Sequence, residues 1–77
     1  MIIKREEHDR YSLRLSVVSD ALYRHFTVVA EDKQNLTVFI AYKKVVFRRY
    51  FTNQRLTLKE CCSVFNGMNK LLSGVAA

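Results

Sequence analysis

The sequence contains no proline and no tryptophan, and its two glycines, Gly67 and Gly74, stand apart from each other. Flexible linkers, low-complexity tails and a glycine-rich phosphate loop are therefore not expected. Charged residues interrupt every apolar stretch well short of the roughly 20 residues that a membrane-spanning helix needs. A secretory signal has a long apolar run near its start, whereas acidic residues already occur within the first ten positions of this chain. We expect a cytoplasmic chain of mostly regular structure.

Residues with metal-binding or nucleophilic chemistry are also scarce. The two cysteines are the neighbours Cys61 and Cys62, and a bridge between neighbours strains the peptide, so we expect reduced thiols. Zinc sites space paired cysteines by two or more residues, because adjacent helix positions point about 100 degrees apart. His8 lies in the mixed-charge stretch 6–9, which is typical of a solvated lead into a first strand. The sequence predicts no metal, no cofactor and no enzymatic activity.

The length of 77 residues predicts one domain, residues 1–77, with enough apolar material for a core. Residues 11–18 alternate between apolar and polar side chains, which is typical of a half-buried strand. Residues 22–30 are rich in aromatic and β-branched residues and predict a second strand, followed by a turn at 31–35. Helical spacing of apolar residues between Tyr11 and Phe26 offers a competing helix, but the β-branched residues favour strands.

Residues 36–51 also predict strand, with a change of phase near residues 42–44. Leu36, Val38 and Ile40 hold the even positions, and Val45, Phe47 and Phe51 hold the odd ones. If both sets face the core, a bulge or a tight turn lies between them. A bulge gives one long bent strand and a sheet of three strands, whereas a turn gives four.

The last third of the sequence predicts an amphipathic helix. Thr57 followed by Glu60 forms a capping box just before apolar residues at helical spacing, and Gly67 marks a weak point inside the helix. Residues 73–77 are expected to form a frayed tail. The whole pattern predicts an α+β fold, in which an antiparallel meander of three or four strands is covered on one face by a C-terminal helix.

Acidic residues are almost missing from the second half of the chain. Residues 1–42 carry six basic and six acidic side chains, whereas residues 43–77 carry seven basic side chains and the single acid Glu60. The formal net charge of the chain is +6. This asymmetry predicts an anionic partner, either nucleic acid or an acidic protein surface.

The segment 42–51 interleaves two basic pairs with aromatic residues. With Val45, Phe47 and Phe51 facing inward, the outer face of this strand would present Lys44, Val46, Arg48 and Tyr50. Cations against phosphates and aromatic rings against bases are typical of sheet surfaces that bind nucleic acid. At the start of the helix, Arg55 and Lys59 form a secondary anion-binding candidate. The predicted binding residues are therefore Tyr42, Lys43, Lys44, Arg48, Arg49, Tyr50, Arg55 and Lys59.

Three functions remain open from the sequence. The first is nucleic-acid binding; the arm-binding domains of phage integrases, which lay a three-stranded sheet on DNA, resemble the chain in the order of their elements. The second is a regulator that binds an acidic surface of another protein. Small phage-borne inhibitors are similar to this chain in being short, proline-poor and without catalytic residues. The third is a homodimeric subunit that uses Tyr23 and Tyr50 at its contact.

Overall fold

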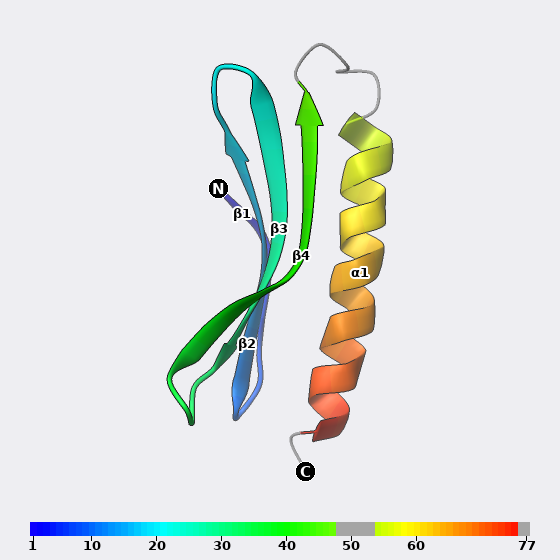
Figure 1. Ribbon diagram of the computed structural model, residues 1–77. Helices are drawn as coiled ribbons and strands as arrows, with labels where there is room; N and C mark the ends of the chain where they lie inside the picture. Colours follow the sequence, from blue (N-terminus) through cyan, green and yellow to red (C-terminus); the bar gives the residue numbers. More distant parts are fainter. Residues whose placement is uncertain (48–53, 76–77) are drawn as a thin grey trace.

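The computed structural model describes residues 1–47 and 54–75 of the chain. It contains four strands, β1 (Ile2–Glu7), β2 (Tyr11–Ser19), β3 (Tyr23–Asp32) and β4 (Thr37–Phe47), followed by the helix α1 (Gln54–Val75). The strands form one antiparallel sheet in the order β1-β2-β3-β4. The helix runs along one face of this twisted sheet (Figure 1). The predicted α+β meander with a C-terminal helix is confirmed.

Two aspartates shape the turns between the long strands. Asp20 Oδ1 accepts hydrogen bonds from the backbone amides of Leu22 and Tyr23 at 2.8 and 2.6 Å. Asp32 Oδ1 accepts from the amides of Gln34 and Asn35 at 3.0 and 3.2 Å. Aspartate favours such turns because its short side chain replaces a backbone acceptor. A turn is present where one was predicted, but it spans residues 33–36 rather than 31–35, because β3 extends to Asp32 and β4 begins at Thr37 rather than at Leu36.

The first strand is a correction to the sequence analysis, which treated residues 6–9 as a solvated lead. Ile2–Glu7 instead pairs antiparallel with β2, with a register shift between Ile2 and Lys4. All six residues of β1 are exposed, so the strand has no alternating burial that its sequence would reveal. The fourth strand of the sheet therefore comes from the N-terminal segment, and β4 is not divided by a turn.

The core lies between the sheet and the helix. Odd-numbered residues of β2 and even-numbered residues of β3 face α1, and a strand pair places directly opposite residues on the same face. The buried apolar residues are Leu13, Leu15, Phe26, Val28, Ala30, Cys61, Phe65 and Leu72. The alternation predicted for 11–18 is confirmed, and Cys61 is part of the core.

The helix begins earlier than the capping box predicts. It starts at Gln54, so Thr57 lies inside the first turns and is buried rather than acting as the N-terminal cap. The helix also continues through Gly67 to Val75, and residues 73–75 of the predicted frayed tail are helical. An added methyl at Gly67 would meet no atom within 4 Å, so close packing does not require this glycine.

The predicted change of phase in β4 is a bulge. The two faces of the strand, however, are the opposite of those expected from the sequence. Val28 pairs with Tyr42 and Val29 pairs with Ile40, which leaves Ala41 as the extra residue. Val38, Ile40, Val45 and Phe47 therefore lie on the face away from the helix, whereas Lys44 and Val46 lie on the helix side. Both faces of this strand carry apolar residues, so its pairing with β3 decides which set is buried.

Tyr42 links β4 to the helix. Its hydroxyl donates a hydrogen bond to Glu60 Oε1 at 2.7 Å. This bond, together with burial of the ring and the negative charge of Glu60, raises the pKa of Tyr42 from 10.0 to about 12. Tyr42, predicted as a ligand-binding residue, thus links the sheet to the helix through its hydroxyl.

We expect Glu60→Gln to lower the pKa of Tyr42, because the change removes the negative charge beside the phenolate. The folded-state pKa is higher than that of an unfolded tyrosine. The contact therefore stabilises the fold below about pH 10, and this stabilisation is lost as the pH rises toward 12. Absorbance titration of tyrosinate measures the shift, and Glu6→Gln on β1 serves as the control. Identical titration curves for the wild type and Glu60→Gln would contradict the assignment.

Candidate binding surfaces

The face of the sheet away from α1 is the largest candidate surface. No described element covers this open face, which we define by its outward residues in register order. From one end to the other they are Glu7, Ser12, Glu31 and Val38; Arg5, Arg14, Val29 and Ile40; Ile2, Ser16, Thr27 and Lys43; Val18, His25 and Val45; and Tyr23 and Phe47. The acids lie at one end, the cations lie near the middle and the aromatic rings lie at the other end.

The aromatic end of the open face is a cluster of three rings. The Tyr23 and Phe47 ring centroids are 5.3 Å apart with a tilt of 53°, and Tyr23 meets His25 edge-on at 6.4 Å. His25 Nε2 also lies 3.1 Å from Asp20 Oδ2, which fixes the imidazole ring. Tyr23 remains 41 % exposed, so the cluster offers an oriented ring to an incoming flat group.

The ion pairs among the described residues all join residues that precede Tyr42. Glu7 accepts from Lys33 Nζ at 2.7 Å, from Ser12 Oγ at 2.9 Å and from Arg5 Nε at 2.9 Å. These contacts lower the pKa of Glu7 to about 2. Asp32 is held by Arg10 at 3.3 Å, and this contact lowers the pKa of Asp32. Three of the six acids of the first half, Glu7, Asp20 and Asp32, are thus paired with basic residues of the same half.

The basic residues of the second half that the structure describes have no carboxylate partner in an ion pair. Within residues 1–47 and 54–75, no ion pair includes Lys43, Lys44, Arg55, Lys59 or Lys70, and Arg14 of β2 also has none. All of these except the half-buried Arg14 are exposed. The positive charge of these described residues of the second half therefore faces solvent.

The predicted binding residues do not form one surface. Lys43 lies on the open face opposite Thr27. Lys44 lies on the other side of the sheet, in a shallow hollow that it shares with Leu56 and Glu60. Arg55 and Lys59 are exposed on α1, and Tyr42 contacts Glu60. Arg48, Arg49 and Tyr50, together with the expected inward Phe51, lie outside the described residues.

The outer face predicted for β4 is therefore wrong for Lys44 and Val46. The structure instead groups Lys43 with Arg14, His25 and Phe47, which sequence reasoning did not connect. The alternation of 11–18 already placed Arg14 on the polar side of its strand. The missing information was the reversed phase of β4, which brings Lys43 to that same side. Tyr23, the other residue expected at a homodimer contact, is exposed on the open face.

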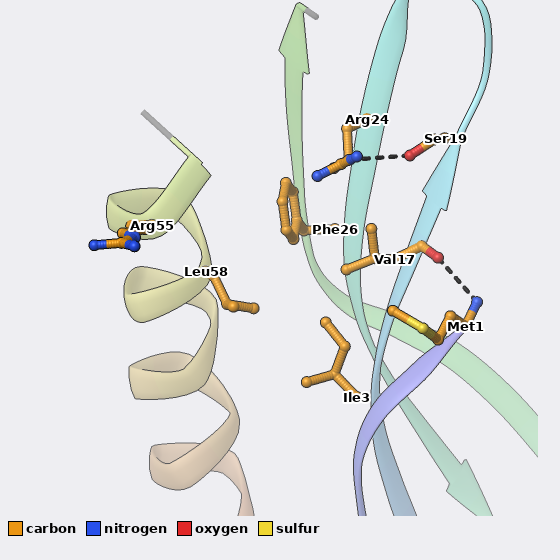
Figure 2. A pocket seen from close by; sticks show the side chains of 8 residues that line it. All are labelled: Met1, Ile3, Val17, Ser19, Arg24, Phe26, Arg55 and Leu58. Carbon is orange, nitrogen blue, oxygen red and sulfur yellow. Dashed lines mark hydrogen bonds between the residues drawn. The ribbon is translucent and has the colours of Figure 1, made fainter. Parts of the chain in front are cut away.

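A second candidate is a pocket of about 420 Å³ between the sheet and the first turns of α1. Figure 2 shows its lining: Met1, Ile3, Val17, Ser19, Arg24, Phe26, Arg55 and Leu58. A backbone hydrogen bond of 2.9 Å from Val17 to Met1 holds the beginning of the chain along β2. The pocket lies on the helix side of the sheet, so it is separate from the open face.

Chemistry that needs a metal or a reactive thiol has little support in the described part of the chain. There, no three His, Cys, Asp or Glu side chains are grouped so as to hold a metal ion. Cys61 is buried in the core, and burial raises the pKa of its thiol, which disfavours the reactive thiolate. Among the described residues, no helix is both long enough and apolar enough to span a membrane.

Comparisons with protein-family models, with curated proteins and with solved structures found no match for this chain.

Proposed function

We propose that this protein is a non-enzymatic, single-stranded nucleic-acid-binding protein whose contact surface is the open face. The observation that carries the proposal is the position of cations without carboxylate partners beside an exposed aromatic cluster. Lys43 on β4 lies two strands away from Arg14 on β2. Both side chains lie between the acidic end of the open face and the Tyr23 ring. Such an arrangement suits a chain of phosphates with unstacked bases, because cations neutralise the backbone and aromatic rings stack on bases.

The other groups on the open face fit this function. Ser16 and Thr27 lie in the same row as Lys43, next to the row of Arg14, and supply hydroxyls for sugar or phosphate oxygens. Val18 and Val45 flank His25 and widen the apolar floor next to the rings. Glu7 and Glu31 lie at the opposite end, which limits the proposed path of the strand to the middle and the aromatic end.

The test is a binding titration of random single-stranded DNA and RNA at 50 and 200 mM salt, followed by fluorescence anisotropy. Two or three phosphate contacts predict an affinity loss of about sevenfold to twentyfold over this range, because each contact releases about 0.7 counterions from a single strand. Tight binding that does not change with salt would contradict the proposal. So would the absence of binding at 50 mM salt.

A homodimer is the second candidate, and one observation favours it. Val38, Ile40 and Val45 are 57, 60 and 43 % exposed on the open face, and exposed apolar residues in one area are typical of protein contacts. Sedimentation velocity over a hundredfold range of concentration separates the two functions. A dimer that dissociates when DNA is added would mean that both partners use this face. A stable dimer without DNA affinity would replace the first function.

A further inference from the structure

The two edges of the sheet differ in their protection against pairing with another chain. In the edge strand β1, four of the six residues are charged, and a register shift interrupts its pairing with β2. Charges and bulges of this kind keep an edge strand from adding a further strand. The edge strand β4 has its charges at Lys43 and Lys44 and its bulge at Ala41, so residues 37–40 have neither. The first half of β4 is therefore an unprotected edge.

This half of β4 exposes apolar side chains on both of its faces. Val38 and Ile40 are exposed on the open face, and Phe39, which pairs with Ala30 on the helix side, is 46 % exposed. Figure 1 shows the first half of β4 curving away from α1, so the helix does not cover it. Among the described residues, β4 pairs with β3 alone. Its outer backbone groups therefore form a template for one more strand.

The turn before β4 adds a further exposed apolar side chain. Leu36 has a φ of 54°, in the left-handed region that glycine and asparagine usually occupy in turns. Its side chain is 83 % exposed. Leucine at this position stabilises neither the turn nor the core, and its exposure beside the apolar strand is typical of a protein contact.

We propose that residues 37–41 pair antiparallel with the same residues of a second copy of this chain, around a two-fold axis beside Phe39. Such a contact is isologous, so one segment supplies both of its sides. Val38 of each copy then lies opposite Ile40 of the other on the open face. The two Phe39 rings lie opposite each other on the helix side, where aromatic pairs stabilise neighbouring strands.

The charge pattern favours a second copy over another partner. The uncharged stretch runs from Gln34 to Tyr42, with Phe39 near its middle. Antiparallel pairing around Phe39 places the lysines of each copy beside the uncharged turn of the other, whereas parallel pairing would bring the Lys43 side chains together. An acidic partner would be selected by cations, and residues 34–42 contain none. The segment is thus complementary to itself.

Two-fold pairing joins the four strands of each copy into one continuous sheet. Because the axis is perpendicular to the sheet, the two helices lie on one side and the two open faces lie on the other. The open face stays uncovered, so this inference does not rest on the nucleic-acid proposal and differs from a homodimer through the open face. The contact is smaller than the roughly 20 to 30 residues per side of a standard interface, so we expect a dissociation constant of about 10 to 100 µM.

Sedimentation velocity of the full chain from about 5 to 500 µM is expected to show a reversible change from monomer to dimer. Larger species are not expected, because two-fold pairing is closed. Over the same range, backbone amide shifts and hydrogen-exchange protection are expected to change at residues 37–41 and to stay constant in β1. Addition of single-stranded DNA is expected to leave the dimer intact.

Variants at the axis test the pairing directly. Phe39→Lys is expected to weaken the dimer at least about tenfold, because it places like charges opposite each other in a strand pair. Ile2→Lys is the matched control, since it makes the same change of charge at the other edge, at a residue that is 51 % exposed. It is expected to change the dimer affinity less than about twofold. Thermal unfolding shows that both variants retain the fold.

A charge-swapped mixture separates self-pairing from a general loss of stability. An equimolar mixture of Phe39→Lys and Phe39→Glu is expected to associate at least about fivefold more tightly than either variant alone, because opposite charges then meet at the axis. A mixture that associates no better than its components would contradict the two-fold axis at this residue.

Other results would also overturn the pairing. They are a monomer at every concentration, equal losses in Phe39→Lys and Ile2→Lys, amide shifts centred on α1, or loss of the dimer when DNA is added. The variant Lys43→Glu separates this inference from the proposed function. It is expected to reduce nucleic-acid binding and to leave the dimer unchanged, so failure of one proposal is distinguishable from failure of the other.

Discussion

The double variant Arg14→Glu/Lys43→Glu is expected to bind single-stranded DNA about tenfold to fiftyfold more weakly than the wild type at 50 mM salt. Both residues lie on the open face, and neither forms an ion pair within the described residues. Reversing their charges removes two phosphate contacts and adds two repulsions. Fluorescence anisotropy with a labelled oligonucleotide measures the change, and the slope of affinity against salt is expected to fall as well.

The matched control is Lys44→Glu/Lys59→Glu. Each double variant lowers the formal net charge from +6 to +2, so both change the long-range attraction of the protein equally. Lys44 is the neighbour of Lys43 but lies on the helix side of the sheet, and Lys59 is exposed on α1. We expect this control to lose less than about threefold in affinity, through long-range charge alone. Equal losses in the two double variants would show that the open face is not the binding surface.

Leu15→Ala is expected to cost about 3 kcal/mol of unfolding free energy, because it removes a fully buried side chain and leaves a cavity. Leu15 is 0 % exposed and pairs with Val28 on the helix side of the sheet. A domain of this size has roughly 4 to 12 kcal/mol of stability in total, so this loss is a large part of it. Urea unfolding followed by circular dichroism measures the free energy, and thermal unfolding is expected about 10 to 25 °C lower.

Leu71→Ala is the control for this core prediction. Leu71 lies on α1 next to the buried Leu72, but 66 % of it is exposed. The same change of side chain is therefore expected to cost less than about 0.5 kcal/mol. A cost for Leu71→Ala similar to that of Leu15→Ala would mean that the exposed side of the helix is covered in solution. That result would support a homodimer that contacts through α1 rather than through the open face.

The sequence predicted most elements of the fold because each had a one-sided pattern. Residues 11–18 alternate, so the buried faces of β2 follow directly from the order of apolar and polar side chains. The spacing from Leu58 to Leu72 likewise predicted the amphipathic helix. The strand β1 was missed because all of its residues are exposed, and an edge strand of this kind is held by its backbone pairing with β2.

The candidate site was harder to predict because it is spread over three strands that are distant in the sequence. Arg14, Tyr23 and Lys43 come together only through the register of β2, β3 and β4. A local window around residues 42–51 grouped Lys43 and Lys44 as one basic pair. Neighbouring strand residues point to opposite faces, so the fold assigns these two lysines to different surfaces.

The sequence by itself determined the class of fold, the single core and the excess of positive charge in the second half. These properties depend on composition and on local periodicity, which every fold of the chain must satisfy. Only the tertiary structure decided which face of β4 is buried, because apolar residues occur on both of its sides. The bulge at Ala41 and the pairing with β3 resolve that ambiguity through long-range backbone hydrogen bonds, and they place Lys43 on the open face and Lys44 beside the helix.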